Sequence, residues 1–213
     1  MDELIKLDNI SFSYDNKNIL LHNVNFNICR GDFIGLVGVN GSGKSTLLKL
    51  ITGVVKPTSG QIRSQKGIKF GYVNQTTSLE EGAFPATVYE IVSLGIKKKP
   101  FSFLSKNDKL KIDQVLELFG LIKLKNKSIN SLSGGQMQKV KIAKVLLANP
   151  DLIILDEPTT GIDTISQEVL LELIKHLHAM KKTILFVSHN SAELNNCTRI
   201  VEISDNGLIE VNK

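Results

Sequence analysis

One segment of the chain reads Gly38-Val39-Asn40-Gly41-Ser42-Gly43-Lys44-Ser45-Thr46 and fits the pattern G-x-x-x-x-G-K-[S/T], the phosphate-binding P-loop. The apolar run before it, residues 33–37, predicts a buried strand, and residues 46–51 predict a helix. The glycines let backbone N–H groups curl around an anion, and the helix N-terminus adds a favourable dipole. We therefore expect a nucleotide phosphate site here, in preference to an ordinary glycine-rich turn.

Two side chains of this segment have distinct expected roles. The Lys44 ammonium would reach the β- and γ-phosphates, and the Ser45 hydroxyl would bind Mg²⁺. The other residues expected to hold the nucleotide are Gly38, Asn40, Gly41, Ser42, Gly43 and Thr46.

Composition limits the class of protein. The 213 residues are enough for one sizeable domain, and 42% hydrophobic with 22% charged residues is typical of a globular chain. Uninterrupted apolar runs fall far short of the ~18 residues of a membrane span, and the acidic opening Met1-Asp2-Glu3 predicts no secretion signal. Cys29 and Cys197 lack a metal-ligand spacing, so we expect reduced thiols in a cytosolic protein. The basic run 97–99 is interpreted as a solvated loop.

Hydrophobic periodicity predicts an α/β fold. Residues 4–14 and 19–28 alternate as antiparallel strands do, and strands then alternate with helices after the P-loop, as in a parallel-sheet core. Asn107 and Asp108 are candidate helix caps, and Thr164 with Gln167 has the form of a capping box. Further strands are expected at 61–63, 68–73, 152–155 and 183–187, with a terminal hairpin of 200–203 and 208–211, and further helices at 88–94, 136–147 and 191–196.

Residues 88–130 show helical patterns only. We therefore predict one domain over 1–213, in which a helical subdomain at about 88–130 is inserted into a nucleotide-binding core. That core, with its antiparallel β subdomain, would comprise about 1–87 and 131–213.

A second chemical element is the apolar run 152–155 followed by two carboxylates. Phosphoryl transfer depends on positioning and charge neutralisation, so a P-loop needs a further metal site and a group that orients water. Asp156 suits the metal, through water, and Glu157 suits a general base or water-positioning group. Alone, an apolar run ending in Asp-Glu is a common strand end, but a preceding P-loop favours the functional interpretation.

The segment Leu132-Ser133-Gly134-Gly135-Gln136 precedes a predicted helix and is a possible second anion site. The alternative is an N-cap followed by flexible glycines. Because one P-loop already serves one triphosphate, a second phosphate site makes sense if it faces the nucleotide of another subunit.

Taken together, these motifs resemble a nucleotide-binding subunit of an ABC transporter, in the family's order and across nearly the whole chain. The resemblance implies ATP and Mg²⁺ as cofactors, an ATP-bound homodimer, membrane permease partners, no nucleic acid, and a peripheral place at the cytoplasmic face of the membrane. It assigns adenine stacking to Tyr14, Mg²⁺ contact and sensing of the membrane subunit to Gln75, and γ-phosphate contact to His189. The residues implied to act across the dimer interface are Ser133, Gly134, Gly135, Gln136 and Asp163.

Two positions depart from the family pattern. Lys139 and Lys144 stand where arginine is usual, which keeps the charge but loses bidentate geometry. Neither position is catalytic, so we still expect hydrolysis of ATP.

The transported substrate is suggested by resemblance alone. Residues 82–88 are similar to a segment of zinc and manganese importers, and residues 157–167 look most like the zinc branch. We expect a zinc importer, ahead of manganese or iron, served indirectly by an extracellular or periplasmic metal-binding protein. Four histidines without a Cys/His cluster predict that the chain does not bind the cargo itself. Competing classes are a soluble ABC ATPase acting on nucleic acid or ribosomes and a catalytically inactive regulatory domain.

Overall fold

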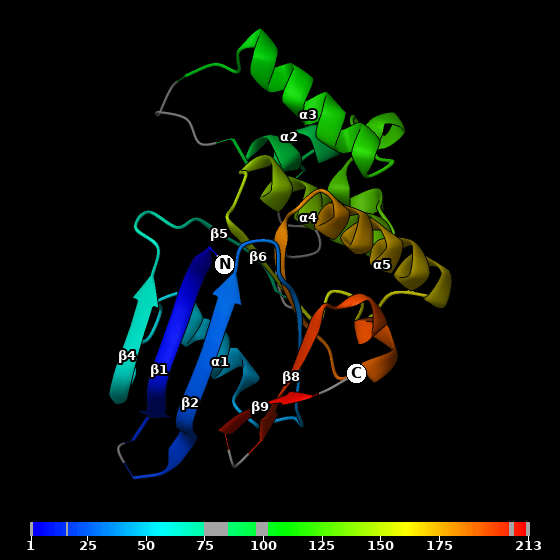
Figure 1. Ribbon diagram of the computed structural model, residues 1–213. Helices are drawn as coiled ribbons and strands as arrows, with labels where there is room; N and C mark the ends of the chain where they lie inside the picture. Colours follow the sequence, from blue (N-terminus) through cyan, green and yellow to red (C-terminus); the bar gives the residue numbers. More distant parts are fainter. Residues whose placement is uncertain (1, 16, 75–84, 97–101, 205–206, 212–213) are drawn as a thin grey trace.

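Two β-sheets enclose helix α1 (Lys44–Ile51), as Figure 1 shows for this computed structural model, which describes residues 2–15, 17–74, 85–96, 102–204 and 207–211. The antiparallel sheet has the order β2-β1-β4. The larger sheet has the order β5-β6-β7-β3-β8-β9, and only its edge strand β9 runs antiparallel to its neighbour. The α/β prediction is therefore confirmed.

The described strands are β1 (Glu3–Ser13), β2 (Ile19–Cys29), β3 (Phe33–Val37), β4 (Ser59–Ser64), β5 (Phe70–Val73), β6 (Leu152–Asp156), β7 (Thr183–Val187), β8 (Arg199–Ser204) and β9 (Gly207–Val211). The other α-helices are α2 (Val88–Ser93), α3 (Lys106–Leu118), α4 (Gly134–Leu147) and α5 (Thr164–Ala179). The described residues also form the 3₁₀ helices η1 (Ile122–Leu124), η2 (Ile129–Ser131) and η3 (Ser191–Asn196).

The central parallel strands β3, β6 and β7 are buried on both faces, so each of them contributes to two apolar clusters. Ile34 and Leu36 of β3 pack with α1 and the antiparallel sheet, whereas Phe33 packs with residues of α4, α5 and η3. Burying one such side chain stabilises the fold by roughly 1.5–3 kcal/mol. The continuous apolar runs seen in the sequence are explained by this two-sided burial. Helices α2 and α3 lie farther from the sheets (Figure 1), and their buried side chains belong to the same apolar cluster as Phe33.

Helices α1 and α4 each begin two residues earlier than predicted, and the caps of two other helices differ from the sequence predictions. Helix α3 is capped by Ser105, whose hydroxyl accepts from the Asp108 N–H, so Asp108 is the reciprocal partner three residues on and neither it nor Asn107 is the cap. Helix α5 is capped by Asp163, whose carboxylate accepts from the Ser166 N–H at 2.9 Å. The predicted Thr164 capping box was wrong because an aspartate one residue earlier already satisfies the helix end.

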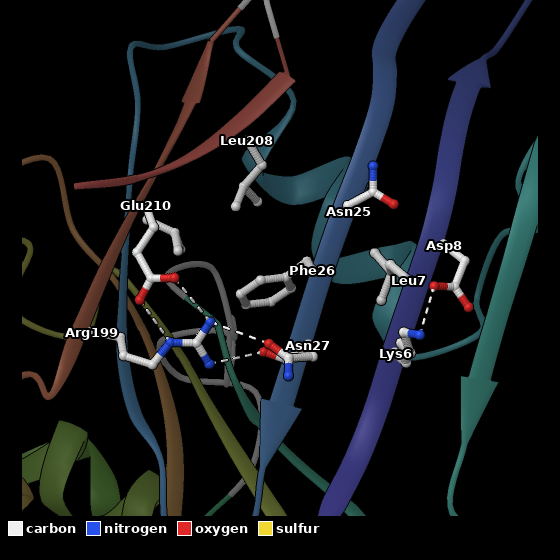
Figure 2. A pocket seen from close by; sticks show the side chains of 10 residues that line it. Lys6, Leu7, Asp8, Asn25, Phe26, Asn27, Arg199, Leu208 and Glu210 are labelled. Carbon is white, nitrogen blue, oxygen red and sulfur yellow. Dashed lines mark hydrogen bonds and ion pairs between the residues drawn. The ribbon is translucent and has the colours of Figure 1, made fainter. Parts of the chain in front are cut away.

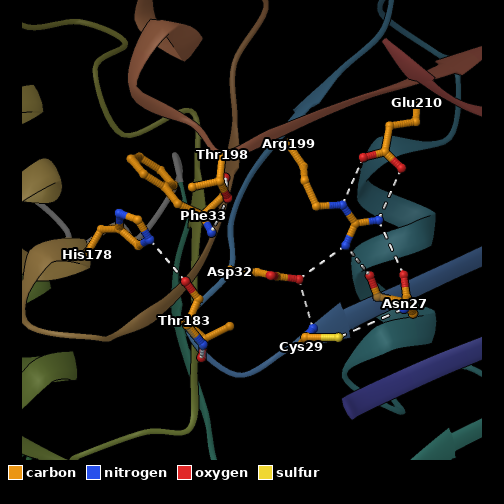
Figure 3. A network of polar contacts seen from close by, with 10 residues as sticks. Asn27, Cys29, Asp32, Phe33, His178, Thr183, Thr198, Arg199 and Glu210 are labelled. Carbon is orange, nitrogen blue, oxygen red and sulfur yellow. Dashed lines mark hydrogen bonds and ion pairs between the residues drawn. The ribbon is translucent and has the colours of Figure 1, made fainter. Parts of the chain in front are cut away.

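The amino ends of the parallel strands are joined by a polar network (Figure 3). The Arg199 guanidinium donates to Asp32 at 3.1 Å and to Glu210 at 2.9 Å, which connects β8 with the turn before β3 and with β9. Asp32 also accepts from the Cys29 N–H at 2.8 Å. On the other side of β3, His178 Nε2 lies 3.0 Å from the Gly31 carbonyl oxygen. These contacts hold the sheet at the end opposite the P-loop.

In the described part of the chain, no helix combines the length and the apolar character required to cross a bilayer.

Candidate nucleotide-binding site

The P-loop follows β3 and passes directly into α1. Gly43 lies at the helix N-cap with φ of +99°, a left-handed conformation that glycine adopts without strain, and a Cβ there would stand 2.8 Å from Leu21 Cδ2. Lys44 is 8% exposed, and its ammonium donates to the carbonyl oxygens of Gly38 at 2.6 Å and Val39 at 3.0 Å. The Lys44 ammonium is therefore held inside the P-loop, where the sequence predicted that phosphate binds.

One buried atom of this loop is unsatisfied. Within the described residues, the Ser42 hydroxyl oxygen is buried and has no hydrogen-bond partner. A buried hydroxyl of this kind costs free energy unless a ligand or solvent pairs with it. Together with the α1 N-terminus, it fits a loop built around a polyanion.

A hollow of about 400 Å³ opens beside the P-loop and brings the two predicted motifs together. The strand-end carboxylates Asp156 and Glu157 face it from β6. Its lining residues are Leu20, Asn40, Gly41, Gly43, Lys44, Ser45, Thr46, Asp156 and Glu157. This arrangement places a cation, hydroxyls and carboxylates around one volume.

Asp156 ends β6 and is held by a residue that sequence reasoning missed. The Tyr72 hydroxyl, from neighbouring strand β5, donates to Asp156 Oδ2 at 2.7 Å. Burial raises the pKa of Asp156, the Tyr72 hydrogen bond opposes that rise, and the nearby Glu157 charge adds to it. Burial and the Asp156 charge raise the pKa of Tyr72, so the phenol remains a donor. The oxygens of Asp156 and Ser45 are of the hard type that Mg²⁺ prefers.

Glu157 has a strained backbone. Its φ is +48°, in the left-handed region that non-glycine residues rarely adopt, and such strain clusters at functional sites. Its N–H donates to the Val187 carbonyl at 3.0 Å, and its Oε2 accepts from the Thr160 hydroxyl at 3.3 Å. Its Oε1 lies 3.7 Å from His189 Nδ1. Of the four residues predicted to be catalytic, Lys44, Gln75, Glu157 and His189, the last two thus lie together at the carboxyl ends of β6 and β7.

Tyr14 lies beside the P-loop helix. Its hydroxyl hydrogen-bonds the Thr46 hydroxyl at 3.2 Å and accepts from the Lys49 ammonium at 3.5 Å. The ring is 62% exposed and packs edge-on against Phe12, with centroids 4.8 Å apart. Tyr14 does not line the hollow, and the Lys49 ammonium lies over its ring, 5.9 Å from the centroid.

The Leu132–Gln136 segment does not line this hollow. Ser133 caps α4: its hydroxyl accepts from the Gln136 N–H at 3.3 Å, and the Gln136 side chain accepts from the Ser133 N–H at 3.2 Å. A Cβ on Gly135 would lie 2.6 Å from Ser166 Cβ, so the start of α4 packs directly on the start of α5, which Asp163 caps. Gln75 lies outside the described residues.

A separate hollow of about 440 Å³ lies between β1, β2, β8 and β9 (Figure 2). Its charged side chains are paired with one another: Lys6 with Asp8 at 3.1 Å, and Arg199 with Glu210 at 2.9 Å. None of the predicted site residues lines it. This hollow therefore has no part in the predicted site.

Comparison with known proteins agrees with this geometry. The sequence profile described as "ABC transporter" matches residues 21–160. The chain belongs to the ABC transporter family. It is similar to the zinc uptake system ATP-binding protein ZurA of Listeria monocytogenes, with 40% identity over 92% of this chain and 80% of the relative. It is also similar to the high-affinity zinc uptake system ATP-binding protein ZnuC of Bacillus subtilis, with 38% identity over 90% and 86%.

Solved structures place the chain among the ATPase cassettes of this ABC transporter family. The dimeric structure of MJ0796, a bacterial ABC transporter cassette, superposes with a TM-score of 0.80 at 30% identity, over 99% of this chain and 100% of that one. A post-hydrolysis state of the same cassette, bound to ADP and Pi, gives 0.80 at 29% identity over the same shares. The predicted family and fold are confirmed.

Proposed function

We propose that this chain is the ATP-hydrolysing subunit of an ABC transporter that imports zinc through partner membrane subunits. The observation that carries the ATPase part is the single hollow shared by Lys44, Asp156 and Glu157. Support for zinc comes from the relatives, because ZurA, ZnuC and the Streptococcus pneumoniae protein AdcC are all named for zinc uptake or transport. The chain would work at the cytoplasmic face of the membrane.

The predicted nucleotide-site residues, whether or not they line the hollow, have proposed tasks. The P-loop N–H groups and Lys44 bind the phosphates, and the α1 dipole adds to their attraction. Glu157 accepts a proton from the attacking water or orients it, and His189 contacts the γ-phosphate from the next strand. Ser45 and Gln75, with Asp156 acting through water, would hold Mg²⁺, which would neutralise charge that develops on the phosphates. The exposed ring of Tyr14 is proposed to stack on adenine.

We propose that the site is completed by a second copy of the chain. The segment Ser133, Gly134, Gly135 and Gln136 would face the γ-phosphate held by the partner's P-loop, and the loop of Asp163 would cross the dimer interface. Two observations support this: these residues lie outside the hollow of their own chain, and the related cassette MJ0796 was solved as a dimer. Because ADP lacks the γ-phosphate, hydrolysis would loosen the dimer. Closure with ATP and opening after hydrolysis would then drive the conformational change of the transporter.

Ser133→Arg tests the shared site. An arginine there places bulk in the proposed interface and leaves the P-loop of the same chain untouched. We expect ATP binding near wild type, with loss of both hydrolysis and ATP-dependent dimerisation in sedimentation. Mixing Ser133→Arg with Lys44→Ala chains should leave one intact site per heterodimer and restore at most partial activity. A Ser133→Arg chain that hydrolyses ATP normally as a monomer contradicts the shared site.

The proposed permease contact is residues 84–88, in the segment that follows Gln75; residues 75–84 lie outside the described part of the chain. We propose that this segment and the helical subdomain at about 88–130 transmit closure of the dimer to the membrane subunits, while 1–87 and 131–213 form the nucleotide-binding core. An extracellular or periplasmic protein would deliver the metal to the permease.

Purification from membranes followed by uptake measurement tests the proposed function. We expect the chain to co-purify with a multi-span membrane protein and, in vesicles, to drive ATP-dependent accumulation of zinc ahead of manganese or iron. A non-hydrolysable ATP analogue should abolish accumulation. Co-purified RNA or DNA in place of a membrane protein would support the soluble class, and accumulation of manganese or iron alone would reject zinc.

A further inference from the structure

A buried carboxylate stands behind the nucleotide site. Glu193, on η3, is 8% exposed. Its Oε2 accepts from the Ser188 hydroxyl at 2.7 Å and from the Thr159 hydroxyl at 2.9 Å. A buried carboxylate is costly unless such donors satisfy it, so both contacts are strong constraints on their neighbours.

The two donors belong to the segments that carry the proposed hydrolytic residues. Thr159 follows Glu157 by two residues, and Ser188 immediately precedes His189. Both donors are almost fully buried, with 4% and 2% exposure. One carboxylate oxygen therefore joins the chain just after Glu157 to the chain just before His189.

Glu193 lies on η3, which packs against strand β3. Its neighbour Leu194 and Cys197 are buried against β3, where a Cβ on Gly35 would lie 2.9 Å from Leu194 Cδ2 and 3.1 Å from Cys197 Sγ. The Thr198 N–H donates to the Phe33 carbonyl at 2.7 Å just beyond η3. The carboxylate is thus anchored to the sheet independently of the P-loop.

The segment after Glu157 needs such support. A residue held at φ of +48° costs on the order of 1–3 kcal/mol and persists only where its surroundings impose it. From the side of α5, the Gln167 amide donates to the carbonyls of Thr159 at 3.2 Å and Ile162 at 3.0 Å. Glu193 holds the same segment from the side of β7.

We propose that Glu193 is a positioning residue for ATP hydrolysis. By accepting from Thr159 and Ser188 on one oxygen, it fixes Glu157 relative to His189 and so sets where water and the γ-phosphate meet. This inference rests on the proposed ATPase function. It assigns Glu193 no contact with nucleotide.

Two substitutions separate hydrogen-bond geometry from simple packing. Glu193→Met keeps a side chain of similar length but removes the acceptor. Glu193→Gln keeps one oxygen that can accept both hydroxyls. We expect Glu193→Met to lower kcat for MgATP at least about tenfold with the KM for ATP within about twofold, because small misplacement of reacting groups is costly while the P-loop is unchanged. Glu193→Gln should retain at least about a third of the wild-type kcat.

Thr183→Val is the matched control. Thr183 is 2% exposed and accepts from the Gly31 N–H at 3.0 Å at the opposite end of β7, so the variant also loses a buried hydrogen bond. We expect its kcat to stay within about twofold of wild type.

Amide hydrogen exchange of the full chain without nucleotide gives a readout independent of activity. In Glu193→Met, the Glu157 N–H that donates to Val187 and the Ser188 N–H that donates to Leu36 should exchange at least about tenfold faster, while amides of α1 keep their rates. Glu193→Gln and Thr183→Val should leave both amides near wild type.

The outcomes separate this inference from the proposed function. A wild-type chain without ATPase activity rejects the proposed function and, with it, the hydrolytic role of Glu193. If the wild type hydrolyses ATP, the inference alone is overturned by a Glu193→Met kcat within twofold of wild type. It is also overturned if Glu193→Gln is as impaired as Glu193→Met, if Thr183→Val is equally impaired, or if exchange at Glu157 and Ser188 is unchanged.

Discussion

The two ends of the parallel sheet are built from similar polar residues but arranged for different tasks. At the amino end, Arg199 is paired with two carboxylates, at 3.1 and 2.9 Å (Figure 3). At the carboxyl end, Ser42 has a buried hydroxyl without a partner in the described chain, Glu157 has a left-handed backbone, and the His189 side chain is 65% exposed. Ligands of open α/β sheets bind outside the carboxyl ends of the strands. The difference indicates that one end stabilises the fold and the other is kept available for a ligand.

Glu157→Gln should have the largest effect. It keeps the size of the side chain but removes its ability to take a proton, and general acid–base groups contribute about 10²- to 10⁴-fold. We expect steady-state hydrolysis to fall at least about 100-fold while ATP still binds and holds the dimer closed. Turnover within twofold of wild type would show that Glu157 does not activate the attacking water.

Lys44→Ala should come next. Loss of the ammonium removes charge-assisted hydrogen bonds to phosphate worth roughly 1.5–3 kcal/mol, which is about ten- to a hundredfold in ATP affinity. Isothermal titration with MgATP measures this directly. An unchanged dissociation constant would show that the P-loop assignment is wrong.

Arg199→Met tests the opposite end. The variant leaves Asp32, whose side chain is 18% exposed, without its guanidinium partner. We expect the free energy of unfolding to fall by about 1–3 kcal/mol in urea denaturation, with kcat within about twofold of wild type. The control is Lys175→Met, which removes an exposed pair with Glu172 at 3.4 Å and should change stability by less than about 1 kcal/mol. Equal losses of unfolding free energy in Arg199→Met and Lys175→Met would show that the Arg199 network stabilises the fold no more than an exposed ion pair does.

Asp156→Asn should have the smallest effect of these variants. Unlike Arg199→Met, it should raise the stability of the fold. Because burial raises the pKa of Asp156, the folded state binds its proton more tightly than the unfolded state, so the ionised carboxylate costs stability above that raised pKa. Asparagine removes the charge and still accepts from Tyr72. We expect the variant to melt a few degrees higher than wild type at neutral pH, and the difference to shrink as pH falls through the raised pKa. A lower melting temperature at neutral pH would contradict this.

The sequence predicted the parts of the molecule that depend on local patterns. Continuous apolar runs identified β6 and β7, alternation identified β1 and β2, and the P-loop with Asp156 and Glu157 identified the hollow. The strands were predicted correctly because burial imposes a residue pattern over a short stretch, and the P-loop pattern is equally local.

What the sequence missed depends on contacts between distant segments. Tyr72 reaches Asp156 across 84 positions and Glu193 reaches Thr159 across 34, and neither pair shows a local signal. A tyrosine in a strand suggests only packing, and a glutamate in a short helix suggests only a solvated face. Likewise, Thr164 matched a capping pattern, but the choice between it and Asp163 depended on which oxygen meets the Ser166 N–H.

The claim that the amino end of the sheet stabilises the fold and the carboxyl end carries the chemistry is tested most directly in Glu157→Gln and Arg199→Met. For both variants, kcat for MgATP and the midpoint of urea unfolding are measured side by side. The account predicts that Glu157→Gln loses at least about 100-fold in kcat with an unchanged midpoint, whereas Arg199→Met has a lower midpoint with kcat within about twofold of wild type. A Glu157→Gln chain that hydrolyses ATP at the wild-type rate, or an Arg199→Met chain that loses hydrolysis while its midpoint is unchanged, would contradict it.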